Sequence, residues 1–436
     1  MKRELKIFLT LLGVFLAAYF LPLGNPAVKA AILEAFRLLQ WYARNHTLAC
    51  VVPALFIAGA ILTFLSRESI LRYLGPGAPK LTAYTVASIS GTVLAVCSCS
   101  VLPMFAGIYK LGAGLGPASA FLYSGPAINV LAVFLTARVL GPSLGLARAV
   151  GAVLFAFLVG ILMAFLFRRE EREKEKAAAL QAPPAAAPAR PLWKTLLLFC
   201  CMILFLVFSD WFNPGNVKVL ARKGPSFDAV LLQETVDHYR FQLEQDWMGR
   251  KKGARVTLPK EEVLGMEEPR TWVLAVYHTR WYLAGLMGLL VVLMSWKWLE
   301  REEISEWMEN TWDFTKLLVP LLFGGVFAVG FLSSLLPPKV VAGLVGDNSL
   351  GSNLAAALVG LFWYFATLTE IPICEALGRM GMHKGPMLTL LLAGPALSLP
   401  SILVIAKVMG PRKTLAFCVI IALVSAAAGM LYGALP

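Results

Sequence analysis

The stretch Cys97-Ser-Cys-Ser-Val-Leu-Pro103 lies inside sequence that is otherwise apolar enough to cross a membrane. A related stretch, Thr367-Leu-Thr-Glu-Ile-Pro372, follows at an offset of 269 residues, since 372 − 103 = 269. Gly125-Pro126-Ala127 and Gly394-Pro395-Ala396 recur at the same offset. Proline removes a backbone donor and clashes with the preceding helical turn. Two helices broken at equivalent places, with polar residues at the breaks, therefore indicate a transport site.

Composition places the chain in the membrane. Of its 436 residues 58% are hydrophobic and 15% are charged, against about 25% charged residues in a soluble domain. The mean hydropathy is +0.72. We expect an all-α polytopic membrane protein with two pseudo-symmetric repeats, broken helices and about 10–11 transmembrane helices. The expected spans lie near 5–23, 46–66, 82–96, 117–137, 144–167, 192–212, 280–298, 315–336, 352–372, 386–406 and 412–434.

Several classes of function are not expected. The net charge of +13 fits basic loops on a membrane protein, and no basic face on a soluble fold suggests nucleic-acid binding. The chain has no G-x-x-x-x-G-K-[ST] phosphate loop. Its seven cysteines lie in or beside expected spans, which is not a secreted disulfide framework. We expect no metal, no cofactor and no catalytic residue.

The organisation follows from the repeat. Residues 1–44 form a transmembrane helix and an interfacial helix at 27–42, and residues 45–167 form the first permease repeat. A charged and Ala/Pro-rich linker covers 168–191. Residues 192–312 hold two transmembrane helices around an extramembrane insert at about 213–278, and residues 313–436 form the second repeat. Within the insert, Ser226 is expected to cap an amphipathic helix that ends near Trp247.

Charged loops leave the membrane orientation open. Lys2, Arg3 and Lys6 favour a cytoplasmic N-terminus, but counting spans from there puts the basic linker outside, against the positive-inside rule. A re-entrant half-helix near a break would change the number of crossings by one and remove this conflict. Parallel and inverted repeats both remain open.

The breaks define the candidate substrate site. Proline and glycine free backbone groups near the middle of the membrane, and these groups must face protein or a wet cavity. Asn129 and Ser398 can hydrogen-bond freed backbone groups, a ligand, or both. The candidate substrate-binding residues are Cys97, Ser98, Cys99, Ser100, Pro103, Gly125, Pro126, Asn129, Thr367, Thr369, Glu370, Pro372, Gly394, Pro395 and Ser398.

Three side chains at the breaks have specific chemistry. Cys97 and Cys99 carry soft sulfur ligands suited to a thiophilic substrate, although buried cysteines often serve only as small core residues. Glu370 is a carboxyl group in an apolar stretch, which is costly and therefore indicates function. We expect it to couple transport to a proton. The structural alternative is that it reaches water or pairs with a base.

These segments resemble a known family. The run from Cys97 to Gly107 and the run Gly116-Pro-Ala-Ser-Ala-Phe-Leu-Tyr-Ser-Gly-Pro-Ala-Ile-Asn129 resemble the predicted permease family that includes YraQ-like and ArsP-like proteins. The stretch around Pro372 and Ala393-Gly-Pro-Ala-Leu-Ser-Leu-Pro400 look like the second half of the YraQ-like branch. The resemblance covers most of the chain outside 170–310.

The resemblance implies more about activity than about substrate. ArsP-like members export trivalent organoarsenicals such as methylarsenite, which implies efflux of thiophilic organic arsenic, with the family cysteines at Cys97 and Cys99. Many YraQ-like members have no established substrate. We therefore expect a multi-pass permease of the bacterial inner membrane, a secondary transporter rather than an enzyme.

Two alternatives stay open. A membrane thiol or redox enzyme would use the Cys97/Cys99 pair, although the Cys-x-Cys spacing does not favour it. The second alternative is a channel for another small molecule. The sequence leaves open the substrate, the direction, the coupling ion, the oligomeric state and the role of the insert.

Overall fold

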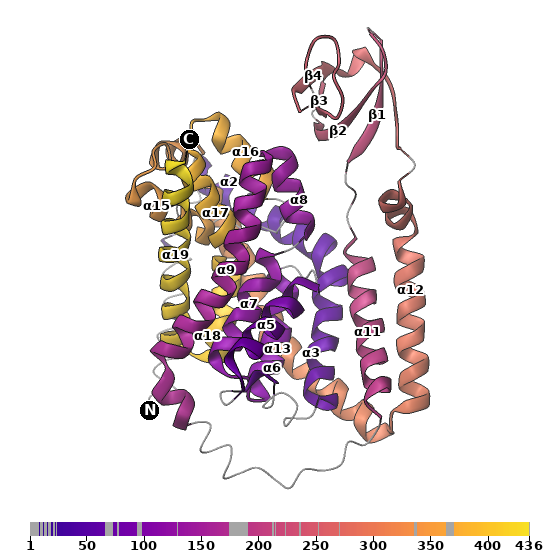
Figure 1. Ribbon diagram of the computed structural model, residues 1–436, viewed down its shortest axis with the longest axis vertical. Helices are drawn as coiled ribbons and strands as arrows, with labels where there is room; N and C mark the ends of the chain where they lie inside the picture. The colour runs from indigo at the N-terminus through magenta and orange to yellow at the C-terminus, as the bar shows by residue number, and fades with distance from the viewer. Residues whose placement is uncertain are drawn as a thin grey trace.

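The computed structural model covers most of the chain. It describes residues 8, 12, 15, 19, 20, 22, 24–65, 73–75, 78–93, 98–128, 130–173, 191–211, 213, 215–222, 224–234, 237–251, 253–269, 271–334, 338–362 and 370–435. The expected first span at 5–23 and the Ala/Pro-rich linker therefore lie mostly outside the described residues. Figure 1 shows a bundle of helices, with a separate pair of helices at one side that carries a small β-sheet.

Helices of two halves of the chain build the bundle. The first half contains α3 (Val52–Phe64), α5 (Lys80–Val93), α6 (Ser98–Lys110), α7 (Leu115–Ala127), α8 (Val130–Val139) and α9 (Pro142–Leu166). The second half contains α13 (Arg301–Ser334), α14 (Pro338–Leu344), α15 (Leu350–Phe362), α16 (Glu370–Arg379), α17 (Lys384–Leu397), α18 (Leu399–Met409) and α19 (Pro411–Ala434). The starts of α7 and α17 differ by 384 − 115 = 269, and those of α9 and α19 by 411 − 142 = 269.

The turns between these helices also recur at that offset. Gly112 and Gly381 follow α6 and α16 with φ of 105° and 106°, and Gly141 and Gly410 precede α9 and α19 with φ of 115° and 91°. Residues with a side chain rarely adopt this left-handed conformation. The glycines therefore fix the same sharp turns in both halves.

Small residues bring the long helices together. An added Cβ at Gly116 of α7 would lie 2.9 Å from the carbonyl oxygen of Gly160 in α9. At Gly385 of α17 it would lie 2.8 Å from the carbonyl oxygen of Gly429 in α19. Because apolar burial does not drive association between helices in lipid, such close backbone packing supplies much of the contact.

Two long helical segments pack side by side at the edge of the bundle. α2 (Pro26–Tyr42) continues through the π-helix η1 (Ala43–Val51) directly into α3. This segment packs on α13, where Phe36 and Phe327 meet at 5.1 Å and Trp307 Nε1 donates to the carbonyl oxygen of Phe56 at 2.8 Å. The helix expected at 27–42 is present, but as a continuation of the next span.

The membrane expectation is confirmed: the chain has the form of an all-α polytopic membrane protein outside its insert. Five helices in the described residues are long and apolar enough to cross a membrane, or seven if each of two bent pairs counts as one span. This is fewer than the expected 10–11. One expected span, 5–23, lies mostly outside the described residues, and the apolar runs near 82–96, 192–212 and 352–372 form only short helices in the described part of the chain. For example, α5, with 14 residues, is about 21 Å long against about 30 Å of hydrocarbon.

Each pair of short helices, α5 with α6 and α15 with α16, starts and finishes at the same end of the molecule. The backbone N–H of Gly114, after α6, donates to the carbonyl oxygen of Leu74, before α5, at 2.7 Å. That of His383, after α16, donates to Val345, before α15, at 3.0 Å. We call residues 80–110 the first hairpin and 350–379 the second hairpin. Their connections, 94–97 and 363–369, are outside the described residues.

The two hairpins enter from opposite ends. α9 and α19 are antiparallel, because Ser143 Oγ lies 3.1 Å from Tyr432 Oη at one end, while Lys413 Nζ lies 3.1 Å from Glu170 at the other. The first hairpin reaches the Glu170 end, and the second reaches the Tyr432 end, where Lys384 contacts the carbonyl of Leu435. Figure 1 accordingly shows α6 low and α16 high in the bundle.

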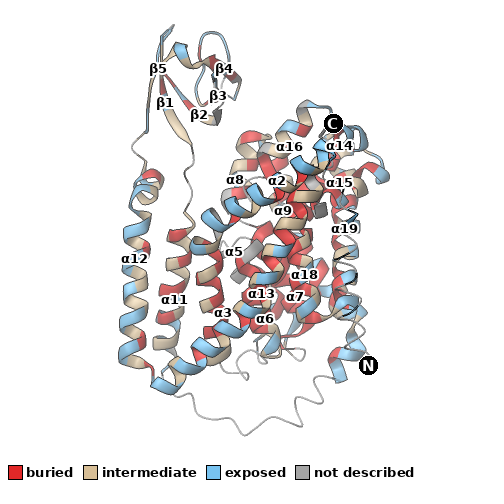
Figure 2. Cartoon of the chain, turned by 180° about the vertical axis from the view of Figure 1, so that it is seen from behind, coloured by how far each residue is buried: buried red, intermediate tan, exposed pale blue. Residues whose placement is uncertain are grey.

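The helices α11 (Leu192–Ser209) and α12 (Trp272–Trp298) form a pair at the side of the bundle (Figure 2). Trp193 and Trp298 meet at one end with ring centroids 5.6 Å apart, and Trp211 and Trp272 meet at the other end at 6.1 Å. Tryptophan concentrates at both membrane–water interfaces. The outer face of α12 exposes large apolar side chains, such as Trp296 at 82%, as expected for a helix in lipid.

The insert is a five-stranded antiparallel sheet. It consists of β1 (Asn216–Ala221), β2 (Phe227–Glu234), β3 (His238–Leu243), β4 (Arg255–Pro259) and β5 (Val263–Glu267), in the order β4-β3-β2-β1-β5. The edge strands β4 and β5 are joined by only the 3₁₀ turn η2 (Lys260–Glu262), so the sheet must curl until its edges approach. Phe227, Phe241 and Trp247 fill a core of its own.

The helix expected from Ser226 to Trp247 is therefore wrong. Phe227, Val230 and Leu231 fit a helical spacing, but Phe227 and Ala229 are buried on one side of β2 while Asp228 between them is exposed. This alternation has the period of a strand. β2 pairs with β3 along most of its length, and the pairing overrides the weak helical pattern.

Candidate substrate site between the two halves

The structure places the predicted site residues unequally. Ser100, Pro103, Gly125, Pro126, Glu370, Gly394, Pro395 and Ser398 are buried in the bundle. Ser98, Cys99 and Pro372 belong to helices α6 and α16, but their side chains are outside the description. Cys97, Asn129, Thr367 and Thr369 lie outside the described residues altogether. The Cys97/Cys99 pair therefore stays a prediction.

The broken helices are present as two bent pairs. α7 and α8 meet at 46°, and α17 and α18 meet at 48°. Pro126 and Pro395 lie in the last turns of α7 and α17, where they oppose continuation of the helix. At the second bend, Ser398 Oγ lies 2.7 Å from Ser401 Oγ. Ser398 is the N-cap position of α18, but its side chain caps no backbone N–H group there, so its role stays a prediction.

The two bent pairs touch each other. Tyr123 Oη on α7 donates to the carbonyl oxygen of Leu392 on α17 at 3.1 Å, and the two residues are 269 positions apart. They are therefore equivalent positions of the two halves in direct contact. We refer to this contact between the two bent pairs as the centre of the bundle.

A buried ion pair joins the halves beside this centre. Arg148 on α9 donates through Nη2 to Oε1 of Glu370, the first residue of α16, and both side chains are fully buried. Arg148 Nη1 also donates to Thr136 Oγ1 on α8 at 2.8 Å. Breaking such a pair by removing one partner typically costs about 3–5 kcal/mol. The pair therefore strongly couples α16 of one half to α8 and α9 of the other.

The ion pair is incomplete. Within the residues the structure describes, Arg148 Nε and Glu370 Oε2 are buried and have no hydrogen-bond partner. More than about 90% of buried polar groups in proteins have one. The pair thus offers one donor and one acceptor that none of the described residues uses.

The other half has no charge at the equivalent positions. Adding or subtracting 269 carries Arg148 to Phe417, Glu370 to Val101 and Thr136 to Ile405. These three residues are apolar and buried, at 0%, 1% and 1% exposure. In each pair of positions 269 residues apart, only one carries a polar side chain.

Sequence reasoning found Glu370 and missed Arg148. The sequence predicts that this intramembrane carboxylate either carries a proton or pairs with a base, and the structure provides the base, Arg148. The missed signal was available, because Arg148 lies within the apolar run 144–167, where any charge is a functional candidate. Cys374, one turn after Glu370 on α16, is also fully buried.

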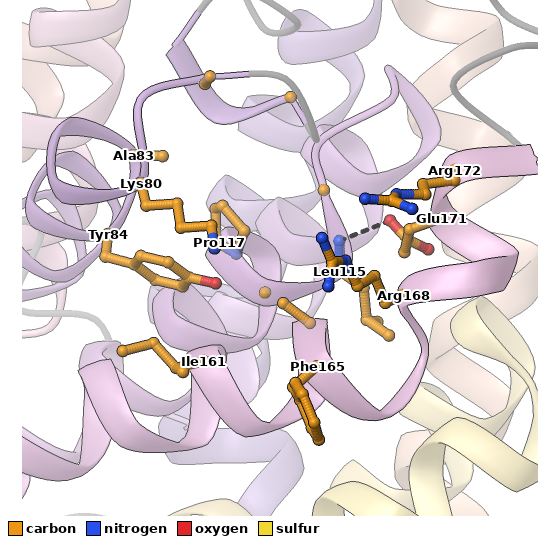
Figure 3. A pocket seen from close by; sticks show the side chains of 15 residues that line it. Lys80, Ala83, Tyr84, Leu115, Pro117, Ile161, Phe165, Arg168, Glu171 and Arg172 are labelled. Carbon is orange, nitrogen blue, oxygen red and sulfur yellow. Dashed lines mark hydrogen bonds between the residues drawn. The ribbon is translucent and has the colours of Figure 1, made fainter.

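A separate pocket lies at the end of the bundle where the first hairpin enters. It has a volume of about 430 Å³ and is lined by α5, the start of α7 and the end of α9 (Figure 3). Lys80, Arg168 and Arg172 line it, while Glu171 accepts a hydrogen bond from the backbone N–H of Leu115 at 2.9 Å. None of the predicted site residues that the structure describes lines this pocket. Its anion-attracting helix end is already capped by Glu171.

The insert is attached to the end of α8 at the opposite end. Arg138 donates to Asn216 Oδ1 at 2.8 Å and to the carboxylate of Glu244, and Gln242 Nε2 donates to the carbonyl oxygen of Arg138 at 2.6 Å. We call these contacts the Arg138 clasp. The equivalent position in the second half is Lys407, so the clasp belongs to one bent pair.

The helical bundle, its membrane-length apolar helices and its central polar contacts define a multi-pass membrane protein with the features of a permease. The chain belongs to the predicted permease family (ArsP_1), whose model matches residues 32–434.

Two relatives support the assignment. UPF0718 protein MJ0584 of Methanocaldococcus jannaschii is 35% identical over 390 residues, which cover 89% of this chain and 92% of that protein. UPF0718 protein YraQ of Escherichia coli is 32% identical over 111 residues, which cover 26% of this chain and 31% of that protein. No solved structure matches the chain.

Proposed function

We propose that this permease is a secondary transporter that moves a small molecule between its two halves, which act as inverted repeats. The common offset of helix ends, the antiparallel course of α9 and α19 and the contact between Tyr123 and Leu392 support this arrangement. Inverted repeats with discontinuous helices commonly bind substrate near the middle of the membrane. The first and second hairpins would reach that level from opposite ends.

The observation that carries the proposal is the buried ion pair between Arg148 and Glu370. A purely structural junction between the halves needs no charge, and the positions 269 residues away hold the buried apolar residues Phe417 and Val101. Ionisable residues in membrane segments are costly and usually belong to transport pathways. Their energetic cost fits a contact that opens and closes during a cycle.

We propose that Glu370 couples transport to a proton. In the closed arrangement its carboxylate is paired with Arg148. Protonation removes the negative charge and weakens the pair, so α16 can separate from α9. Rocking of one half against the other would then expose Glu370 to the opposite end, where the proton leaves and the pair forms again.

Basic residues suggest the orientation in the cell membrane. Lys80, Arg168, Arg172 and Lys413 gather at the end where the first hairpin enters. The positive-inside rule places that end in the cytoplasm. The insert, clasped to Arg138 near the other end, then lies outside.

For the substrate we propose a trivalent organoarsenical moved by efflux. The family resemblance and the Cys97/Cys99 pair at the start of the first hairpin's second helix support this choice. Trivalent arsenic is thiophilic, and thiolates are soft ligands. The two cysteines come from one half and Glu370 from the other, so a bound substrate would be held by both halves.

The test is methylarsenite accumulation in cells that express the protein. Accumulation should fall with the wild type and return to the level of empty-vector cells with Cys97→Ser/Cys99→Ser. Cys200→Ser is the matched control, because Cys200 is exposed on α11 away from the bundle centre. Accumulation unchanged by the wild type rejects this substrate, and full activity of the double variant makes the pair structural.

A further inference from the structure

We propose that Arg148 Nε and Glu370 Oε2 form the polar part of a binding site for a small uncharged molecule that carries hydroxyl groups. This inference rests on the proposed transport function, to which it adds a residue, Arg148, and a chemical class of substrate. It is carried by the two unused polar atoms of the buried ion pair.

The unused atoms point to a ligand because they are expensive to leave unpaired. An unsatisfied buried donor or acceptor costs about 1–3 kcal/mol, and more when it is charged. Arg148 uses Nη1 for Thr136 and Nη2 for Oε1 of Glu370, which leaves Nε–H as a donor. Glu370 has its second oxygen, Oε2, as an acceptor.

The geometry of the two groups suits one hydroxyl group. The guanidinium is planar, and Nε and Nη2 lie on the same edge of it. Since Nη2 holds Oε1 of Glu370, the free Nε–H and the free Oε2 lie beside the same contact. A hydroxyl oxygen can accept from Nε–H while its hydrogen donates to Oε2. An amine cation lacks the acceptor, and a carboxylate lacks the donor.

Charge selects against ions at the same place. Arg148 and Glu370 together carry no net charge, and both side chains are fully buried. An ion beside them would bring an uncompensated charge into a region of low dielectric constant, which is costly. A neutral molecule adds no charge and satisfies both atoms.

Neutral hydroxy acids of trivalent elements fit this description. Boric acid and arsenous acid are uncharged at neutral pH, small, and carry several hydroxyl groups. Boric acid lacks affinity for thiols, so its binding reports on the polar atoms alone. Arsenous acid would add contacts with sulfur, which separates the contribution of Cys97 and Cys99 from that of the ion pair.

Calorimetric titration of the purified full-length protein in detergent tests the inference, with boric acid as the probe and phosphate, acetate and guanidinium as ionic comparisons. Boric acid should bind the wild type, and the three ions should not. Arg148→Lys keeps the charge but loses the Nε–H of the fork, so its Kd for boric acid should rise about tenfold or more. Arg138→Lys is the matched control, because Arg138 lies in the clasp outside the site, and its Kd should stay at the wild-type value.

A second variant guards against misfolding. Arg148→Phe/Glu370→Val copies the apolar residues of the other half and should fold but bind no boric acid. The inference is overturned if the wild type does not bind boric acid, if an ion binds as tightly, or if either variant binds like the wild type. Boric acid binding without any transport would reject the transporter and keep the site. Methylarsenite transport without boric acid binding would keep the transporter and reject the site.

Discussion

Replacing the buried ion pair should reveal how the two halves are held together. We consider three variants: Glu370→Val, Arg148→Phe and the double variant. The double variant places at the ion pair the residues that the other half already has at Val101 and Phe417. The double variant should therefore pack well, because the bundle already holds the same two apolar residues at Val101 and Phe417.

The structure sets the size of the effects. Both side chains are fully buried, so each single variant leaves an uncompensated charge in the bundle. Such a charge should lower the free energy of unfolding by about 3–5 kcal/mol. Replacing both partners by apolar residues of similar size is often neutral or stabilising by about 1–4 kcal/mol. The double variant should thus be at least as stable as the wild type.

Unfolding of the purified proteins in mixed micelles, followed by circular dichroism, measures all four free energies. The double-mutant cycle should give a coupling energy of several kcal/mol, since the two residues are in direct contact. Additive effects of the single variants would refute the reasoning, because they would mean that the side chains do not interact. Single variants as stable as the wild type would show that the site is wet rather than buried.

Further variants test the packing and the attachments of the bundle. Gly429→Ala should destabilise by about 1–3 kcal/mol in the same unfolding assay, since its Cβ would meet Thr389 and lie 2.6 Å from the carbonyl oxygen of Gly385, whereas Gly324→Ala, with open space around it, should not. Tyr123→Phe should cost about 0.5–1.5 kcal/mol by removing the hydrogen bond to Leu392; an unchanged stability would mean that water replaces it. Arg138→Ala should speed hydrogen exchange at the end of α8 while the core of the insert stays protected, and equal exchange in both proteins would show that the clasp is not formed.

Much of the membrane fold follows from the sequence. Apolar runs with turn-forming glycines such as Gly141 and Gly410 repeat at a fixed spacing, and period and spacing are local properties of the chain. The sequence indicated re-entrant segments only indirectly, because one re-entrant half-helix would reconcile the charged loops with the count of spans. Whether an apolar run crosses the membrane or turns back depends on what packs at its end, as with Gly114 against Leu74, and this is a tertiary property.

Part of the candidate site could also be predicted from the sequence, and part could not. Glu370 stands out in the sequence because a carboxyl group among apolar residues is rare, but its partner Arg148 is 222 positions away and no local pattern links the two. For the insert, a local pattern was present but gave the wrong secondary structure. Phe227, Val230 and Leu231 satisfy a helical spacing by chance, and only pairing with β3 decides for the strand.

Proteoliposome flux tests most directly the claim that substrate passes between the halves at the ion pair. Wild type and Arg148→Phe/Glu370→Val would be reconstituted at equal amounts, with methylarsenite on one side and a pH gradient across the membrane. The wild type should transport methylarsenite at a rate that depends on the gradient, and the folded double variant should show only the leak of empty liposomes. A double variant that transports at the wild-type rate would contradict the account, because the ion pair would then lie off the pathway.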